Sequence, residues 1–377
     1  MLSLTLGNVV PLIVNRYLND VTRKNLRYCI VIICSIGFVG GVGMAIFWNH
    51  ATKIGKRHYS IALYLLFLLV GACASTSNVT HYIYVSQYSN IETTCLSTGM
   101  ALGSTTAGVL AILQGLVLET YGMSVSYTYL AVALLYLPAL AALLLDRKTS
   151  TAISARFQND SDQRVRLLKG GGDSGHDDCH HVSDMYPADM TETEDRSPCD
   201  QSLTPSPLHG PYATILQLHA FNASLGYGVI PSLISPICSR FQSASTVLLL
   251  ATGLACTLDP IFRFFTVYRA LQTTREIKIG TGILCVLAVA LLVTLTLPRD
   301  SQLLTSPGGV AGLYPVLLYV MFGVSFGYIN TSIFLYLKHH VHLQEIQEGY
   351  RWAGVMSQIG ALVGSIVSFS LVISGII

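Results

Sequence analysis

Ten long apolar runs constrain the fold of this sequence more than any other feature. A helix of roughly 20 apolar residues crosses a hydrocarbon layer about 30 Å thick. Lipid offers the backbone no hydrogen-bond partner, so such runs form helices or a closed barrel. Barrel strands alternate polar and apolar residues, and the run 61–70 does not. The sequence therefore predicts an all-α membrane protein with about ten transmembrane helices, at 1–17, 28–49, 60–85, 97–118, 127–146, 213–237, 244–267, 279–297, 309–337 and 350–374.

Charged side chains are scarce and unevenly distributed. They make up 11% of the 377 residues, whereas soluble domains carry about 25%. Residues 147–212 hold seven Lys/Arg and eleven Asp/Glu, which is 18 of the 42 charged side chains in the chain. The formal net charge of +2 is too small to indicate a nucleic acid as partner. These numbers exclude a soluble enzyme of ordinary type, a nucleic-acid-binding protein and a disordered chain.

The polar segment 147–212 divides the apolar runs into two groups of five. It contains Gly170-Gly171-Gly172, several prolines and charges of both signs, a composition typical of a disordered linker. We therefore predict an N-terminal transmembrane bundle over 1–146 and a C-terminal transmembrane bundle over 213–377. Two helix groups joined by a linker are typical of secondary transporters.

The distribution of Lys and Arg predicts the orientation in the membrane. Basic residues collect in the linker 147–212 and in the short loops 18–27, 268–278 and 338–349. Cytoplasmic loops are enriched in such residues, so the linker is expected in the cytoplasm. The loop 50–59 carries three basic residues on the opposite side and departs from the rule.

Several polar side chains interrupt the apolar runs, and most of them are amides. Polar groups at bilayer depth raise the free energy and tend to mark substrate paths. Amides suit a neutral solute with many donors and acceptors. For any one residue, a hydrogen bond between helices is the more common role; for the set as a whole, we favour a polar cavity. The set comprises Asn8, Asn78, Gln114, Gln217, His219, Asn222, Tyr227, Asp259, Arg263, Asn330 and Gln358.

Asp259 and Arg263 are the two oppositely charged members of this set. Their i, i+4 spacing places them on one helix face, where they can pair. A self-neutralising structural ion pair is the favoured interpretation, and a clamp on a substrate is the alternative.

Glycine spacing predicts where helices approach closely or break. Gly99/Gly103 and Gly360/Gly364 are both GxxxG pairs, which favour close helix packing. Gly226 and Gly228, just before Pro231, instead indicate a broken helix, a feature that transporters use to expose backbone groups.

No pattern in the sequence indicates catalysis, a cofactor or a metal centre. Walker A, Rossmann and HExxH motifs are absent, and no CxxC pair occurs among the nine cysteines. A His/Asp/Cys cluster at 176–181 has metal-binding residue types but lies in the predicted linker. We therefore expect neither an enzyme nor a metalloprotein.

Several segments together resemble the eukaryotic riboflavin transporter family, solute carrier family 52. In the first half these are Phe47-Trp48-Asn49-His50, Ser77-Asn78-Val79-Thr80 and Val109-Leu110-Ala111-Ile112-Leu113-Gln114-Gly115. In the second half they are Gly228-Val229-Ile230-Pro231 with Cys238, and Ala353-Gly354-Val355 with Gln358, Gly360 and Gly364. The resemblance covers nearly the whole chain except the linker.

The resemblance implies eleven helices, six before a cytoplasmic linker and five after it. Leu6-Gly7-Asn8 resembles the second helix of the family, so the first family helix is expected to be missing from this sequence, as in a truncated gene model. The sequence departs from the family pattern at Met100, Ala107, Tyr227 and Ile333, where the family tends to have Gln, Pro, Asn and Lys. These departures bear on substrate preference.

The resemblance also implies the substrate. Riboflavin is neutral, with a flat apolar ring system, a polar pyrimidine edge and a polyhydroxyl tail, so its site needs aromatic faces together with amides or hydroxyls. Tyr82, Tyr84 and Tyr328 are additional aromatic candidates. The candidate substrate-binding residues are Asn8, Asn78, Gln114, Tyr227, Asn330 and Gln358.

The expected function is riboflavin transport across the plasma membrane through a midplane site between the two bundles, with no cofactor. A carrier for another neutral solute, such as a nucleoside, is one alternative. A membrane receptor that transports nothing, or a truncated paralogue, is another. The oligomeric state stays open.

Overall fold

The computed structural model describes residues 7–17, 23–54, 57–86, 88–114, 124–145, 212–241, 243–297, 310–341 and 345–374. The chain divides into two compact units, Met1–Leu140 with Pro207–Ile377, and Ala141–Ser206. The elements described below belong to the first unit, except that the last turn of α7 extends into the second. Of the predicted linker 147–212, only Tyr212 lies within the described residues.

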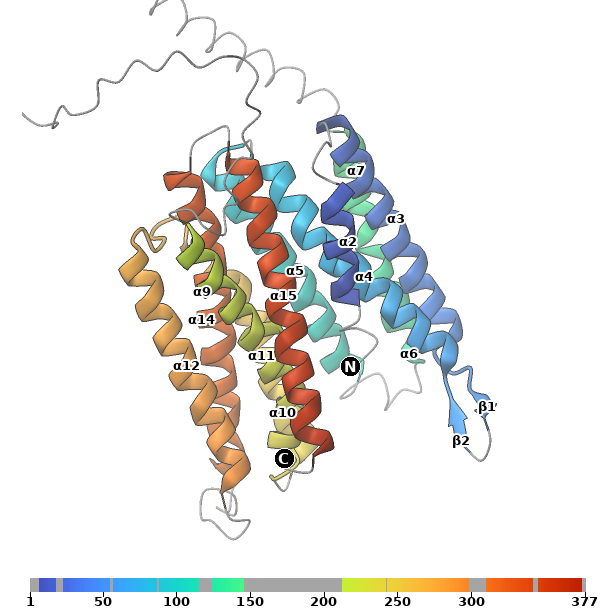
Figure 1. Ribbon diagram of the computed structural model, residues 1–377. Helices are drawn as coiled ribbons and strands as arrows, with labels where there is room; N and C mark the ends of the chain where they lie inside the picture. Colours follow the sequence, from blue (N-terminus) through green and yellow to red (C-terminus); the bar gives the residue numbers. More distant parts are fainter. Residues whose placement is uncertain are drawn as a thin grey trace, which may run out of the picture. The chain divides into compact units, whose positions relative to one another are not determined.

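The described elements before the linker are helical except for one short hairpin (Figure 1). In chain order they are η1 (Gly7–Val9), α2 (Val10–Tyr17), α3 (Arg23–Phe47), β1 (Thr52–Ile54), β2 (Arg57–Tyr59), α4 (Ile61–Val85), α5 (Asn90–Leu113), α6 (Val125–Leu134) and α7 (Tyr136–Leu145).

The described elements after the linker are all helical (Figure 1). They are α9 (Ala213–Ala223), the π-helix η6 (Ser224–Val229), α10 (Ile230–Cys238), α11 (Ala244–Phe265), α12 (Thr274–Thr296), α14 (Val310–His340) and α15 (Ile346–Ile373).

Seven helices in the described part of the chain are long and apolar enough to cross a membrane. They confirm the predicted class, an all-α multi-pass membrane protein. Its outer surface fits this environment: on α12, Ile279, Ile283, Val286, Val289 and Val293 form an apolar stripe in which every side chain is at least 46% exposed. The count of ten and the arrangement of the helices in two groups stay predictions.

The segment expected as a plain loop at 50–59 contains a β-hairpin. Strands β1 and β2 pair antiparallel, with Thr52 opposite Tyr59 and Ile54 opposite Arg57. This polar connection between α3 and α4 satisfies part of its backbone by strand pairing. It is the one departure from helix among the described elements.

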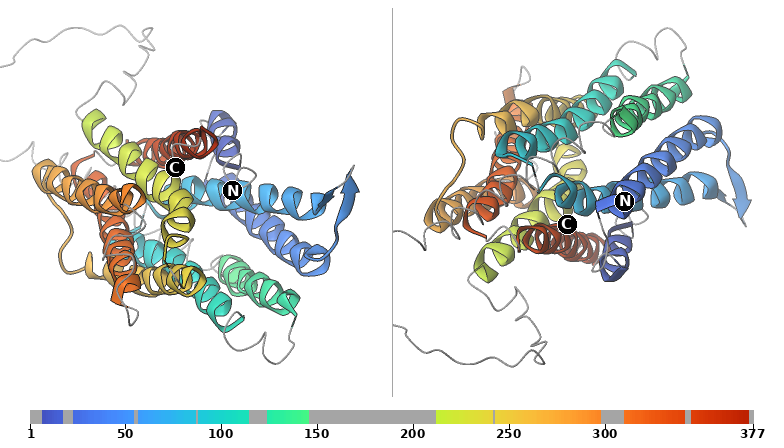
Figure 2. Two further views of the ribbon diagram at one scale, coloured as in Figure 1. Left: turned by 90° about the horizontal axis from the view of Figure 1, so that it is seen from below. Right: turned by 90° about the horizontal axis from the view of Figure 1, so that it is seen from above.

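Helices from the two sides of the linker pack against one another. Helix α5 lies along α11, and α11 also packs against α14. Viewed along the helix axes, α4 lies between α3 and α15 (Figure 2). The main core cluster draws its buried apolar side chains from α4, α9, α10, α11, α12, α14 and α15.

The break predicted from Gly226 and Gly228 does not occur: the chain stays helical from α9 through the π-helix η6 into α10, so the helix is loosened at these glycines but not broken. A Cβ at Gly226 would collide with the ring of Phe326, and one at Gly228 would lie 2.7 Å from Cα of Gly364. Single π-helical turns occur frequently at functional sites. Here the two glycines let α14 and α15 approach this helix closely.

The two GxxxG pairs behave differently. Cβ atoms at Gly360 and Gly364 would collide with the carbonyl oxygens of Ala220 and Ser224, so close packing of α15 on the α9–η6 segment is confirmed. The same prediction for Gly99 and Gly103 is wrong for the described part of the chain, because no atom of it lies within 4 Å of a Cβ built there. Both glycines lie on a part of α5 that no described element covers.

Candidate functional site

The Asp259–Arg263 pair forms as the spacing predicts. Both residues lie on α11, with Nη2 of Arg263 2.9 Å from Oδ2 of Asp259 and Nε 2.9 Å from Oδ1. The side chains are only 9% and 17% exposed for Arg263 and Asp259. Two oxygens of one carboxylate therefore bind one guanidinium, a geometry that adds strength and direction to the ion pair.

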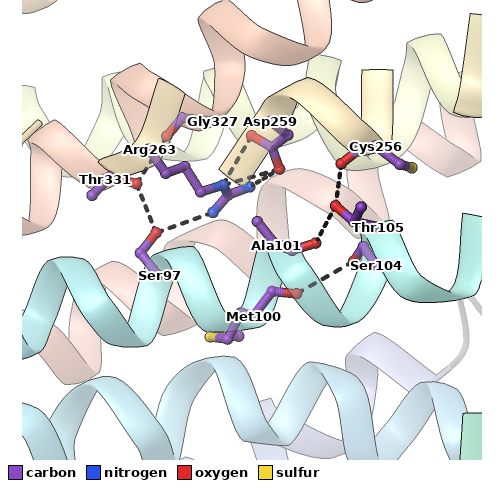
Figure 3. Close-up of polar contacts among 10 residues, drawn as sticks. All are labelled: Ser97, Met100, Ala101, Ser104, Thr105, Cys256, Asp259, Arg263, Gly327 and Thr331. Atoms are coloured by element: carbon purple, nitrogen blue, oxygen red, sulfur yellow. Dashed lines mark hydrogen bonds and ion pairs between the residues drawn. The ribbon is translucent and has the colours of Figure 1, made fainter. Parts of the chain in front are cut away.

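The ion pair connects three helices (Figure 3). Nη1 of Arg263 donates to Oγ of Ser97 on α5 at 3.2 Å, and Ser97 is 2.6 Å from Oγ1 of Thr331 on α14. Thr331 in turn donates to the carbonyl of Gly327 at 2.9 Å. Because these bonds occupy the guanidinium, the geometry supports the structural role over a clamp on a substrate.

Gly327 is the point at which α14 approaches the ion pair. A Cβ at this position would collide with Oδ1 of Asp259 and lie 3.0 Å from Nε of Arg263. Only glycine allows the backbone of α14 this close. A second polar link lies nearby in Figure 3, where Thr105 of α5 donates to the carbonyls of Ala101 and of Cys256 on α11.

Two of the six predicted substrate-binding residues bond other helices. Oδ1 of Asn8 accepts from Ser75 of α4 at 2.7 Å, and Oε1 of Gln114 accepts from Thr128 of α6 at 2.7 Å. These are the interhelical bonds that the alternative interpretation of the amides expects.

Three other predicted residues keep their amides unbonded. Asn78 on α4 is half-buried, and Asn330 on α14 and Gln358 on α15 are 5% and 3% exposed. None of the three makes a side-chain hydrogen bond to any residue that the structure describes. Their amide atoms are not among the completely buried, unpartnered side-chain atoms of the described residues, so a polar solute can reach them, and they are the candidates for contacts with it.

The sixth predicted residue, Tyr227, lies in the π-helix beside the ion pair. Its ring stands edge-on to Phe326, with centroids 4.8 Å apart and planes at 88°. The phenol is within electrostatic reach of Arg263 and Asp259, and the residue as a whole is 39% exposed. The structure therefore brings Tyr227 together with the charged pair.

An aromatic cluster, comprising Tyr82, His219, Phe334 and Tyr350, occupies the interior between α4, α9, α14 and α15. The sequence marks Tyr82 as an aromatic candidate but not Phe334 or Tyr350, because aromatic side chains within apolar runs are common and do not by themselves indicate a site. His219 stands out in the sequence only as a polar residue in an apolar run.

The other two tyrosine candidates lie apart from this cluster. The phenol of Tyr328 donates to the backbone carbonyl of Arg269, and that of Tyr84 receives a bond from Tyr88 at 3.4 Å.

Hydrogen bonds of one lysine join a helix after the linker to residues before it. Nζ of Lys338 on α14 donates to the carbonyls of Tyr88 and Ser89, the latter at 2.7 Å, and to Oγ1 of Thr93 at 3.2 Å. Beside it lies a pocket of about 110 Å³ lined by Asn90, Thr94, Thr266, Tyr268, Gln272 and His339, among others. None of the six candidate residues lines this pocket.

Metal-binding side chains do not cluster in the described part of the chain. Within the described ranges, no group of three or more His, Cys, Asp or Glu side chains is placed to hold a metal ion. The cluster at 176–181 lies outside the described residues.

Comparison with known proteins supplies the family. The family described as "Solute carrier family 52, riboflavin transporter" matches residues 2–127 and 119–374. A relative from Danio rerio, "Solute carrier family 52, riboflavin transporter, member 3-A", is 23% identical over 409 aligned residues, which cover 97% of this chain and 84% of the relative. A solute carrier is a transporter and not an enzyme. The match over nearly the whole chain shows that this protein belongs to solute carrier family 52, the riboflavin transporters.

Proposed function

We propose that this protein transports riboflavin across the plasma membrane. The solute passes through a site near the midplane, between the helices before and after the linker, and the linker faces the cytoplasm. Membership of the family and the riboflavin transporter name of the Danio rerio relative support the substrate. The basic residues of 147–169 support the orientation.

The observation that carries the proposal is the set of three unbonded amides. Asn78 comes from α4, before the linker, and Asn330 and Gln358 come from α14 and α15, after it. An uncharged solute with carbonyl, imide and hydroxyl groups supplies the partners that these amides lack within the protein. The Asp259–Arg263 pair is neutral overall and its guanidinium also bonds Ser97, so it does not call for an ionic substrate.

Alternating access gives these residues their mechanical role. Rocking of one helix group against the other opens a midplane site to each side in turn. The contacts of α5 with α11 and of α4 with α15 cross between the groups and must rearrange during this motion. No chemical change of the solute is involved, so binding and release alone drive its passage.

A carrier for a different neutral solute is the second candidate. Ile333, where the family tends to have Lys, is fully buried in the apolar core, and Met100 packs against the same core. Together with Ala107 and Tyr227, these departures favour a changed preference. Competition of labelled riboflavin uptake by lumiflavin and by nucleosides separates the two candidates, and a receptor that transports nothing would accumulate none of them.

Removing an unbonded amide is expected to reduce riboflavin uptake. In cells that express the full chain, Asn78→Ala and Gln358→Ala should each lower initial uptake by about tenfold or more, because the solute loses a hydrogen bond and its own polar group is left unpaired. The readout is uptake of labelled riboflavin normalised to the amount of protein at the cell surface.

Gln347→Ala is the matched control, since Gln347 lies on the same helix α15 and is exposed. Its uptake should equal that of the wild type. Uptake by Asn78→Ala and Gln358→Ala that matches this control, at equal surface expression, would show that the amides do not contact the solute.

A further inference from the structure

The aromatic cluster contains one pair of rings stacked face to face, one from a helix before the linker and one from a helix after it. Tyr82 of α4 and Phe334 of α14 lie with ring centroids 3.8 Å apart and planes within 3° of parallel. Both side chains are buried, at 3% and 2% exposed. Aromatic pairs in protein interiors more often meet offset or edge-on. Here two helices from opposite sides of the linker present flat faces to each other.

The remaining two rings of the aromatic cluster stand at the rim of this stack. Tyr350 of α15 and His219 of α9 meet Phe334 edge-on, with centroid distances of 5.4 Å and 5.3 Å. Both residues are completely buried. Tyr350 and His219 therefore both stand edge-on to one ring of the buried stack.

Polar atoms at this rim lack partners. Neither ring nitrogen of His219 bonds any group in the part of the chain that the structure describes. A neutral imidazole carries one donor and one acceptor. If the cluster only packed the helices together, phenylalanine or leucine would fill these edge positions equally well. Fully buried polar groups without partners instead point to a ligand that bonds them.

Two of the unbonded amides lie next to the stack. Asn78 precedes Tyr82 by four residues on α4, and Asn330 precedes Phe334 by four residues on α14. Residues at this spacing lie one above the other on a helix face. Each stacked ring therefore has an amide one turn away on its own helix.

We propose that Tyr82 and Phe334 hold the flat ring system of the transported solute between them, with His219 hydrogen-bonding its polar edge. This inference rests on the proposed function and specifies its binding site. Rings in van der Waals contact need to separate to about 7 Å to admit a third ring. Because the two rings belong to helices on opposite sides of the linker, entry of the solute ring moves α4 away from α14 and couples binding to the motion of the two helix groups.

Binding of riboflavin to the purified full chain in lipid nanodiscs tests the stack. Tyr82→Leu and Phe334→Leu should each weaken binding by about tenfold or more. Tyr82→Phe keeps a flat ring and should stay within about twofold of the wild type. Excited flavin takes an electron from a stacked tyrosine and returns it, which quenches fluorescence. Phenylalanine is no such donor, so flavin bound to Tyr82→Phe should be brighter than flavin bound to the wild type.

A methylated analogue of riboflavin tests whether His219 bonds the polar edge of the solute. Methylation of the imide nitrogen in 3-methylriboflavin blocks one donor at the polar edge, so the wild type should bind this analogue more weakly than riboflavin. His219→Leu should bind the two ligands equally. The matched control is Tyr64→Leu, because Tyr64 lies on α4 with 56% of its surface exposed; this variant should retain affinity, quenching and discrimination.

The outcomes separate the two proposals. A wild-type chain that neither transports nor binds riboflavin overturns the proposed function and this site together. A wild-type chain that binds riboflavin, while both leucine variants at the stack bind it equally well and Tyr82→Phe leaves the quenching unchanged, overturns the stacking site alone. Unchanged discrimination in His219→Leu overturns the assignment of the polar edge.

Discussion

Replacing Asp259 with asparagine is expected to lower the free energy of unfolding by about 3–5 kcal/mol. The guanidinium of Arg263 would keep its hydrogen bond to Ser97 but lose its counter-charge. The Arg263 side chain is only 9% exposed, so solvent cannot replace that counter-charge. Arg263→Gln should have a similar effect by leaving the carboxylate unpaired. Denaturant titration of the purified protein in mixed micelles, followed by circular dichroism, measures the loss.

A double variant distinguishes charge pairing from simple packing. Asp259→Asn with Arg263→Gln removes both charges and should recover most of the stability lost in either single variant, because desolvation of two ions nearly offsets their attraction. The Glu348–Arg351 pair is the matched control. It joins residues on α15 at 3.4 Å, and its carboxylate side chain is 42% exposed, so Glu348→Gln should cost no more than about 1 kcal/mol.

Two results would contradict this interpretation. If Asp259→Asn is as stable as Glu348→Gln but abolishes uptake, the pair serves the solute and the clamp alternative is correct. If the double variant is less stable than either single variant, the two charges do not depend on each other.

Alanine at Gly360 or Gly364 should be the second strongly destabilising change, by about 1–3 kcal/mol each. The added Cβ would collide with the carbonyl oxygen of Ala220 or of Ser224, and a backbone atom cannot rotate away as a side chain can. Helix α15 must then shift away from the α9–η6 segment. We expect lower thermal stability and, because Gln358 lies on the same helix, reduced uptake.

The other glycine pair provides the control. Gly99→Ala and Gly103→Ala add a Cβ into open space on α5, and alanine favours a helix by about 1 kcal/mol over glycine. Both variants should be as stable as the wild type or slightly more stable. If the Gly360→Ala protein has the same melting temperature as the Gly103→Ala protein, α15 does not need glycine at this contact.

Hydropathy predicts the apolar helices but misplaces some of their ends. The run expected at 127–146 consists of α6 and α7, separated at Leu135, and Pro138 just beyond cannot supply an amide to continue the first helix. The start of α5 was expected at residue 97 but lies at Asn90. Its first turns carry Thr93 and Thr94, which look like a loop in sequence but are completely buried in the fold.

The candidate site could be anticipated only in part. Amides within apolar runs are conspicuous because they are costly in lipid, so Asn78, Asn330 and Gln358 could be found from the sequence. Nothing in the sequence distinguishes them from Asn8 and Gln114, which bond Ser75 and Thr128. That difference depends on which helices are neighbours.

The amino-acid sequence by itself determined that this protein is helical and lies in a membrane, because long apolar runs with so few charges have no other way to satisfy their backbone in lipid. It also determined the Asp259–Arg263 pair, since four residues make one helical turn. Only the tertiary structure decided that Ser97 and Thr331 complete that pair and that Tyr82 stacks on Phe334. These partners lie far apart in the chain, and their contacts depend on how helices pack against one another, which the periodicity within a single helix does not encode.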